Sequence, residues 1–184
     1  MRIIAGKARG THILAPEGRD TRPTLDRVRE NLFNMIQPRI PGSRVLDLFA
    51  GSGALGLEAV SRGAELAVLA DHSRTASRIQ KENVQKLRFE ATTRVMLADW
   101  REVIRQMEHE GIRFDVVFLD PPYEMADQEN IISSLTPILL PEAWVVLEHQ
   151  AQKRVPIPDE RFQIVKDRSW GYCGITVYEW SEQK

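Results

Sequence analysis

Val45-Leu-Asp-Leu-Phe-Ala-Gly51-Ser-Gly53-Ala-Leu-Gly56 is the stretch that decides the fold. It starts as an apolar strand, turns on closely spaced glycines and continues into a helix, as in nucleotide-binding α/β proteins. Its three glycines satisfy the GxGxxG spacing, and Asp71 follows at the end of the next apolar run. Taken alone, this pattern predicts a dinucleotide site, with a structural turn capped by Ser52 as the alternative.

Asp47 argues for a different ligand. A carboxylate at the strand end would repel a pyrophosphate, which needs backbone N–H groups and positive potential at this place. It would attract a cationic cofactor such as S-adenosylmethionine, which carries sulfonium and ammonium groups. The glycines are needed with either ligand, because the backbone must approach the cofactor without a Cβ in the way. We therefore predict cofactor contacts from Asp47, Phe49, Gly51 and Gly53.

From Arg44 onward, short apolar runs alternate with amphipathic stretches. This alternation predicts right-handed βαβ crossovers and a mostly parallel sheet with helices on both faces. The last two strand-like runs are joined by a short link and predict an antiparallel pair. The expected strands are 44–49, 66–70, 93–98, 114–119, 143–148, 162–166 and 175–180, and the expected helices are 53–62, 74–88, 100–109 and 127–139.

The first 43 residues do not continue this alternation. Residues 2–5 and 11–14 flank a Gly-Lys-Ala-Arg-Gly stretch and predict a small hairpin with a basic turn. A helix is expected over about 25–36, with Thr24 as its N-cap and prolines at its end. We therefore divide the chain into an N-terminal extension, 1–43, and a catalytic domain, 44–184.

The composition is that of an ordinary globular protein. The chain has 184 residues, of which 42% are hydrophobic and 28% charged, which excludes a disordered tail, a collagen-like fibre and a coiled coil. Cys173 is the single cysteine, so neither an internal disulfide framework nor a multi-cysteine zinc site is expected. The apolar runs are too short to span a bilayer, and the first residues lack a signal-peptide core. We expect a cytoplasmic protein without a metal.

The charge is distributed unevenly along the chain. The formal net charge is −1, but residues 1–44 carry nine bases against four acids. A basic N-terminal end on an acidic body indicates contact with a polyanion. We predict that Arg2, Lys7 and Arg9 bind RNA phosphates. The alternatives are a solvated basic surface or a hairpin that only covers a sheet edge.

Asp120-Pro-Pro-Tyr123 follows the fourth expected strand, at the edge where ligands bind in parallel sheets. Two prolines stiffen the loop and remove two N–H donors, so the loop presents acceptors in a fixed geometry. Asp120 and the carbonyl of Pro121 can both accept from a planar amino group, and Tyr123 can stack on a base. Such acceptors would favour attack of an exocyclic base amine on a methyl sulfonium. A rigid strand-ending turn is the alternative.

Two further carboxylates follow strands. Asp71 can accept hydrogen bonds from ribose hydroxyls with either cofactor. Asp99 can accept from an adenine amino group, and it can also cap the following helix. Both roles are compatible for Asp99.

These motifs together resemble a known family. The Asp47-Leu-Phe-Ala-Gly-Ser-Gly and Asp120-Pro-Pro-Tyr motifs look like those of S-adenosylmethionine-dependent amino-methyltransferases. The blocks Arg2-Ile-Ile-Ala-Gly, Thr21-Arg-Pro-Thr-Leu-Asp-Arg-Val-Arg-Glu-Asn-Leu-Phe-Asn34 and Leu55-Gly-Leu-Glu-Ala59 narrow this to the RsmD-type bacterial 16S ribosomal RNA guanine-N(2)-methyltransferases. The resemblance covers nearly the whole chain.

The resemblance implies a Rossmann-like class I methyltransferase fold with a seven-stranded sheet, and S-adenosylmethionine as cofactor. It implies a substrate guanine in 16S ribosomal RNA, within a small-subunit assembly intermediate, and a monomeric enzyme. It places Arg22 and Thr24 over the methionine end of the cofactor. Asp71 departs from the family, where Glu is usual, and is one methylene shorter. The target guanine would meet Asp120, Pro121, Pro122 and Tyr123.

Three other functions remain open from the residues. Adenine N(6) methylation in DNA or RNA would use the same Asp-Pro-Pro-Tyr loop, although no separate DNA-recognition domain is visible. An NAD-dependent oxidoreductase fits the glycine spacing but conflicts with Asp47. A non-catalytic RNA-binding assembly protein conflicts with the intact catalytic loop. The four histidines have no ligand spacing, and we expect His72 to be a surface residue.

Overall fold

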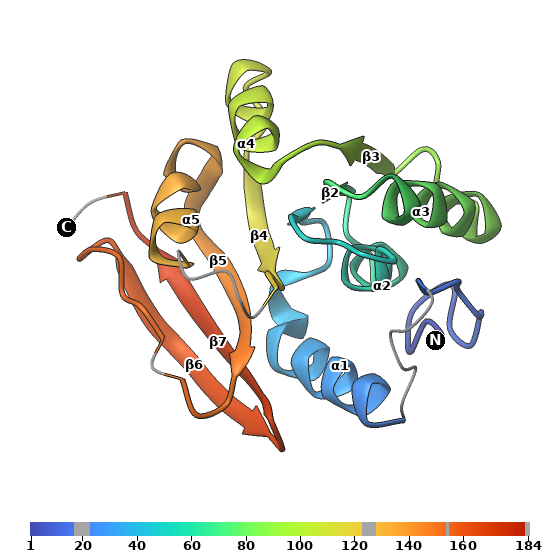
Figure 1. Ribbon diagram of the computed structural model, residues 1–184, viewed down its shortest axis with the longest axis horizontal. Helices are drawn as coiled ribbons and strands as arrows, with labels where there is room; N and C mark the ends of the chain where they lie inside the picture. The colour runs from blue at the N-terminus through green and yellow to red at the C-terminus, as the bar shows by residue number, and fades with distance from the viewer. Residues whose placement is uncertain (17–22, 123–127, 154, 183–184) are drawn as a thin grey trace.

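A computed structural model describes residues 1–16, 23–122, 128–153 and 155–182. A sheet of seven strands runs through its centre in the order β3-β2-β1-β4-β5-β7-β6 (Figure 1). Neighbouring strands pair in parallel from β3 to β5, and β7 is antiparallel to both β5 and β6. The strands are β1 (Arg44–Asp47), β2 (Leu66–Asp71), β3 (Thr93–Leu97), β4 (Phe114–Leu119), β5 (Leu139–Gln150), β6 (Phe162–Trp170) and β7 (Cys173–Trp180).

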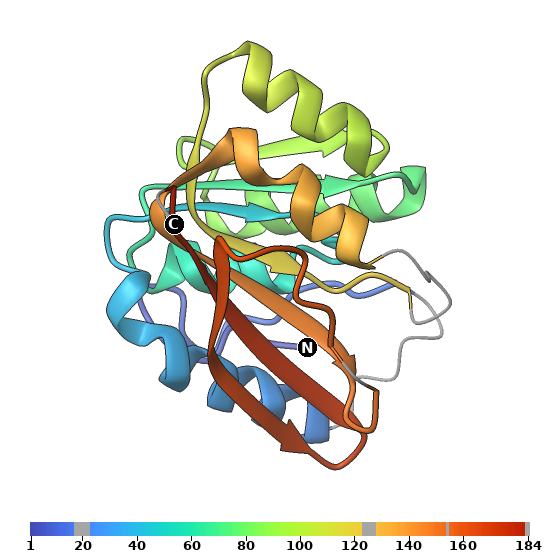
Figure 2. The same cartoon turned by 90° about the vertical axis from the view of Figure 1, so that its left-hand side faces the viewer.

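Helices cover both faces of the sheet. Alternate residues of the strands pack in opposite directions, so that Val45 contacts the helix α1 side and Leu46 the α4 side. Figure 2 shows α4 and α5 on one side of the central strands and α1 on the other. The α-helices are α1 (Pro23–Ile36), α2 (Ala54–Ser61), α3 (Arg74–Leu87), α4 (Trp100–His109) and α5 (Gln128–Ser134), and short 3-10 helices occupy Gln37–Arg39 and Thr136–Ile138.

The predicted fold class is confirmed: the sheet is seven-stranded and mostly parallel, and it is covered on both faces. The expected helix over 127–139 is shorter, because α5 ends at Ser134 and a 3-10 turn containing Pro137 follows. Proline has no N–H to continue an α-helix. The strand expected over 143–148 is longer, since β5 already begins at Leu139. Asp127 lies outside the described residues.

The N-terminal segment, residues 1–16, forms the expected small hairpin. An antiparallel bridge joins Arg2 to His12, and three backbone hydrogen bonds pair residues 1–3 with residues 10–13. Gly6, between the two arms, lies against α2 with φ +81°, so close to the carbonyl of Ser61 that an added Cβ would be 1.8 Å from its oxygen. Ile3 and Ile13 are buried in the cluster formed with α2 and α3. The hairpin therefore packs on α2 and α3, and its contact with RNA stays a prediction.

The start of α1 also needs a correction. The helix begins at Pro23, so Thr24 lies within its first turn and is not the N-cap. Proline suits a first helical position because its missing N–H has no intrahelical partner there. At the other end α1 stops at Ile36, directly before the 3-10 turn that contains Pro38. Within the described ranges, no helix is long and apolar enough to cross a membrane.

Candidate active site

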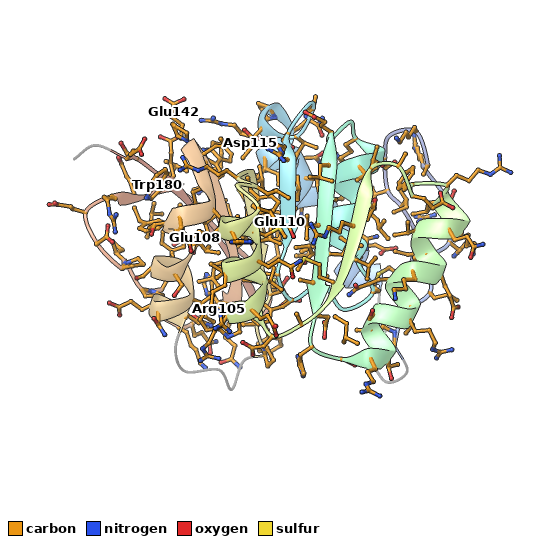
Figure 3. All side chains as sticks on the ribbon, turned by 90° about the horizontal axis from the view of Figure 1, so that it is seen from above. Arg105, Glu108, Glu110, Asp115, Glu142 and Trp180 are labelled. Carbon is orange, nitrogen blue, oxygen red and sulfur yellow. The ribbon has the colours of Figure 1, made fainter. Side chains whose placement is uncertain are left out.

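Four carboxylates gather at the carboxyl edge of the parallel strands. Asp71 ends β2, Asp47 ends β1, Asp120 follows β4 and Glu148 lies near the end of β5. Because β2, β1, β4 and β5 are neighbours in that order, their carboxyl ends lie along one edge. Ligands of open parallel sheets bind at this edge, close to where the strand order reverses. The opposite edge carries acids with a structural role, such as Asp115, which accepts a hydrogen bond from Arg44 N. Figure 3 shows Asp115 and Glu142 at this same end of the strands.

A cavity of about 140 Å³ opens at the carboxyl edge. An internal cavity of about this size can hold a benzene-sized group, so it suits one end of a nucleoside cofactor rather than the whole molecule. The N-terminal segment supplies one wall through Met1, Ala15 and Pro16. The cavity is lined by Met1, Ala15, Pro16, Val28, Arg29, Leu32, Asp47, Phe49, Ala50, Ser52, Ala54, Leu55, Asp120, Glu148 and Ile175.

Asp47 is almost completely buried in the wall of this cavity, with 1% of its surface exposed. Its Oδ2 accepts a hydrogen bond from Gly56 N at 3.0 Å, and its Oδ1 has no hydrogen-bond partner within the described part of the chain. Burial raises the pKa of Asp47 to about 7; the Gly56 N–H opposes this shift, and the charges of Asp120 and Asp71 add to it. A buried acceptor without a donor is costly in a folded protein. Asp47 Oδ1 can therefore bind a hydrogen-bond donor or a cation supplied by a ligand.

The glycine loop is held by two side chains. Gly51 N donates to Asp71 Oδ2 at 2.9 Å, and Gln80 donates from Nε2 to the Gly51 carbonyl at 3.0 Å. Asp71 Oδ1 also accepts from Ser73 N. Both oxygens of Asp71 thus orient backbone, and each keeps a second lone pair. The ribose contact of Asp71 stays a prediction.

Two glycines of the motif are required by internal packing. A Cβ on Gly56 would lie 2.2 Å from Leu69 Cδ2, so only glycine lets α2 approach β2 this closely. Gly53 has φ +82°, a left-handed conformation that favours glycine, and its Cβ would also meet Leu69 at 2.8 Å. Gly53 and Gly56 thus allow the loop and α2 to lie close to Leu69 of the sheet. Whether the loop also contacts a cofactor through Gly51 stays a prediction.

Arg29 is a residue of this cavity that the sequence interpretation missed. Its Nη2 donates to the carbonyl of Arg2 and to Asp26 Oδ1, while its buried Nε has no partner among the described residues. Burial lowers the pKa of Arg29, and the charges of Glu58 and Asp26 oppose this shift. The only signal in the sequence is the spacing of Val28, Arg29 and Leu32 on α1, which brings all three to the cavity.

The Asp-Pro-Pro-Tyr loop is described as far as its second proline. Asp120 lines the cavity, Pro121 is buried and Pro122 is exposed. Tyr123 and Arg22 lie outside the described residues, and so does the side chain of Thr24. Asp99 is the N-cap of α4 and accepts from Arg101 N at 3.0 Å, so its capping role is confirmed and its adenine contact stays a prediction.

The three predicted RNA-binding residues lie on the N-terminal hairpin. Arg2 is exposed and its Nε lies 3.9 Å from Asp26 Oδ2 of α1. Lys7 faces α3, with its Nζ 4.6 Å from the ring centroid of Phe89, and Arg9 is exposed. His72 is exposed as expected, with 77% of its side chain accessible. No group of three or more His, Cys, Asp or Glu in the described ranges could hold a metal ion.

Comparison with known proteins places the chain in a family. A family model described as Conserved hypothetical protein 95 matches residues 1–179. A Haemophilus influenzae protein named ribosomal RNA small subunit methyltransferase D is 35% identical over 182 residues, covering 97% of this chain and 93% of that protein. The chain belongs to the RsmD family. The resemblance inferred from the Thr21–Asn34 block is thus confirmed.

Solved structures agree with this family. The structure of yhhF from Escherichia coli matches with a TM-score of 0.84 and 34% sequence identity. The match covers 100% of this chain and 99% of the yhhF chain. SMU.776, solved in complex with SAH, has a TM-score of 0.70 over 83% of this chain and 48% of that chain. At 14% identity it shows the fold alone. The class I methyltransferase fold of this member of the RsmD family is therefore established.

Proposed function

We propose that the protein transfers a methyl group from S-adenosylmethionine to the exocyclic 2-amino group of a guanine in small-subunit (16S) ribosomal RNA. The observation that carries this proposal is the unpaired, buried Oδ1 of Asp47 in a cavity that also contains Asp120. The names of the RsmD relatives support ribosomal RNA as the substrate. The family resemblance supports guanine N(2) as the acceptor.

The cavity suits the methionine end of this cofactor. Within the described part of the chain, Asp47 Oδ1 and Arg29 Nε have no hydrogen-bond partner, and both residues line the same cavity. This pair matches a group that carries both an ammonium and a carboxylate. We assign Asp47 to the cationic part and Arg29 to the carboxylate. Asp71, Asp99 and the loop at Gly51 would then hold the nucleoside. When bound, S-adenosylmethionine supplies an electrophilic methyl group at the sulfonium.

Asp120 and Pro121 would orient the acceptor amine. The lone pair of an exocyclic amine is delocalised into the base, so the amine is a poor nucleophile until its hydrogens are drawn out of the ring plane. Acceptors held in place by the two prolines favour this geometry and stabilise the positive charge that develops on nitrogen. Asp120 stands next to Asp47 along the sheet edge, which brings the amine to the cofactor side. Tyr123 would stack on the extruded base.

The basic N-terminal segment would contact the RNA backbone. Arg2, Lys7 and Arg9 carry exposed side chains on one segment that also walls the cavity through Met1. Phosphate contacts from such residues position an RNA without reading its sequence. The natural substrate would be the RNA within an assembling small subunit.

The test is analysis of nucleosides from small-subunit RNA after incubation with the protein and isotopically labelled S-adenosylmethionine. Free RNA and isolated small-subunit particles are compared. We expect labelled N(2)-methylguanosine, with more label from the better substrate. Labelled N(6)-methyladenosine would support the adenine alternative instead, and no labelled nucleoside from either substrate would contradict the proposal. Thermal shift with S-adenosylmethionine against NAD tests the oxidoreductase alternative, because a ligand that binds the native state stabilises it.

A further inference from the structure

Glu148 on β5 is a carboxylate that lies beside Asp120, which follows β4. Leu119 of β4 and Leu147 of β5 are register partners, so the residues that follow them, Asp120 and Glu148, lie side by side. Neighbouring strands are about 4.8 Å apart. Both residues line the same cavity. Asp120 belongs to the Asp-Pro-Pro-Tyr motif, whereas no sequence motif points to Glu148.

The order of the strands places Glu148 in the part of the site where the target base would bind, away from the cofactor end. Asp71 on β2 and Asp47 on β1 belong to the cofactor end of the edge, and Asp120 after β4 comes next. Glu148 on β5 is one strand farther from the glycine loop. If the amine is held at Asp120, the ring atom next to that amine can reach Glu148. This step rests on the proposed function, because it takes the reacting amine to be at Asp120.

The chemistry of purines then distinguishes guanine from adenine. Guanine has a ring N1–H donor next to its 2-amino group, whereas adenine has an N1 acceptor next to its 6-amino group. A carboxylate offers acceptors only, so it binds the first edge and repels the second. We propose that Glu148 accepts a hydrogen bond from N1–H of the target guanine while Asp120 accepts from the 2-amino group. Glu148 is thus a specificity-determining residue that rejects adenine.

The surroundings of Glu148 hold it in place. Burial raises the pKa of the Cys173 thiol, and so do the charge of Glu148 and a hydrogen bond to its side chain. The thiol therefore stays protonated and acts as a donor toward this carboxylate. On the next residue of β5, the buried His149 ring bonds Thr176 of β7 through Nε2 at 2.9 Å. These contacts fix the strand end, and a carboxylate can accept from more than one donor at a time.

The test compares guanine with 2-aminopurine at the methylated position of a ligated small-subunit RNA. 2-Aminopurine keeps the 2-amino group but has an acceptor at N1. We expect the protein to methylate guanine at least about 10- to 100-fold faster, the usual effect of leaving a buried polar group unpaired. The Glu148→Gln variant can turn its amide to donate to N1 of 2-aminopurine. It should lower the rate on guanine, raise the rate on 2-aminopurine and bring their ratio toward one.

Controls separate the possible failures. Glu142→Gln changes an exposed glutamate of the same strand at the opposite edge and should keep the parent ratio. Calorimetry with S-adenosylmethionine should give an affinity within a few-fold of the parent for both variants. Equal rates of the parent on the two purines, or an unchanged ratio in folded Glu148→Gln, would overturn the role of Glu148. Absence of any N(2)-methylguanosine with the parent would instead contradict the proposed function.

Discussion

Two buried carboxylates, Glu58 and Asp47, have opposite surroundings. Glu58 on α2 has no exposed surface and accepts from Ile4 N at 2.8 Å and Ala5 N at 3.0 Å. The Arg62 Nε donates to it at 2.7 Å. Asp47 is as deeply buried, but among the residues described it has one backbone donor, no ion-pair partner, and an Oδ1 without a hydrogen bond.

The difference separates a structural carboxylate from a binding one. The donors of Glu58 come from the N-terminal segment and from its own helix, so its charge attaches the segment to the core. The unpaired oxygen of Asp47 opens to a cavity, so its charge is available to a ligand. Burial alone therefore does not reveal a site, whereas burial with an incomplete set of donors does.

The largest expected effect is on the free energy of unfolding, when the structural carboxylate Glu58 is removed. Glu58→Ala leaves the buried Arg62 Nε and two backbone N–H groups without their acceptor, while Arg62 Nη1 still donates to Gln37 Oε1. Breaking a buried ion pair in this way costs about 3–5 kcal/mol of unfolding free energy. Denaturant unfolding measures it, and Glu65→Ala, an exposed acid beyond the same helix, is the matched control. A loss below about 1 kcal/mol would contradict the structural role, because exposed substitutions reach about half of that.

The next effect concerns turnover. Asp120→Ala removes an acceptor of the reacting amine and should lower kcat about 100- to 1000-fold, as loss of a transition-state hydrogen bond does. The affinity for S-adenosylmethionine should stay within a few-fold, because Asp120 is assigned to the amine. Labelled methyl transfer and calorimetry on the same preparation measure both quantities. A variant with near-normal turnover would show that the catalytic assignment is wrong.

Asp47→Asn should change affinity and stability in opposite directions. An asparagine can still accept from Gly56 N, but it has no charge for a cationic cofactor, and we expect an affinity loss of about 10- to 100-fold. The raised pKa of Asp47 means that its charge destabilises the free protein above neutral pH. The unfolding free energy of the variant without cofactor should therefore be higher by roughly 1–3 kcal/mol at pH 8. Equal affinity in both proteins would contradict the role of Asp47.

Stability and cofactor affinity should both depend on pH through the ionisation of Asp47. With its pKa raised to about 7 in the folded protein, Asp47 binds a proton more tightly than in the unfolded chain. Its stabilising contribution is present below about pH 4 and is lost as the pH rises through 7. Cofactor affinity has the opposite trend, because only the ionised form attracts the cation, and it should fall up to about tenfold per pH unit below 7. Calorimetry between pH 5 and 8 tests this, with Asp47→Asn expected to be nearly flat.

The smallest expected effect is at the surface of the N-terminal segment. Replacing Lys7 and Arg9 by Glu should weaken RNA binding and flatten its salt dependence by roughly 0.7–0.9 in log–log slope per lost phosphate contact. The backbone bonds that attach the segment through Glu58 do not involve these side chains, so the melting temperature should change little. Binding of labelled RNA across a salt series measures the slope. An unchanged slope with a lowered melting temperature would indicate a purely structural segment.

Several site residues could be predicted because their signals are local. Asp47 and Asp120 stand at strand ends next to stretches that strongly favour a turn, so their edge of the sheet follows from the alternation of elements. Arg29 and Glu148 have no such signal. Arg29 reaches the cavity only because α1 packs on one face of the sheet, and Glu148 lies beside Asp120 only through the register of β4 with β5. The N-terminal hairpin could be predicted from its local turn residues. Its attachment to α2 and α3 could not, because those buried contacts are with helices far along the chain.

The sequence by itself determined the fold class, the edge where ligands bind and the two motifs that carry the proposed chemistry. These depend on hydrophobic periodicity and on the backbone preferences of glycine and proline, which act over a few residues. Only the tertiary structure decided which carboxylate is structural and which is available. The donors of Glu58 lie 53 and 54 residues away, at Ala5 and Ile4, and the unpaired oxygen of Asp47 is defined by donors that the fold does not bring. Hydrogen-bond satisfaction is a property of the packed molecule, because it depends on which distant groups meet once water is excluded.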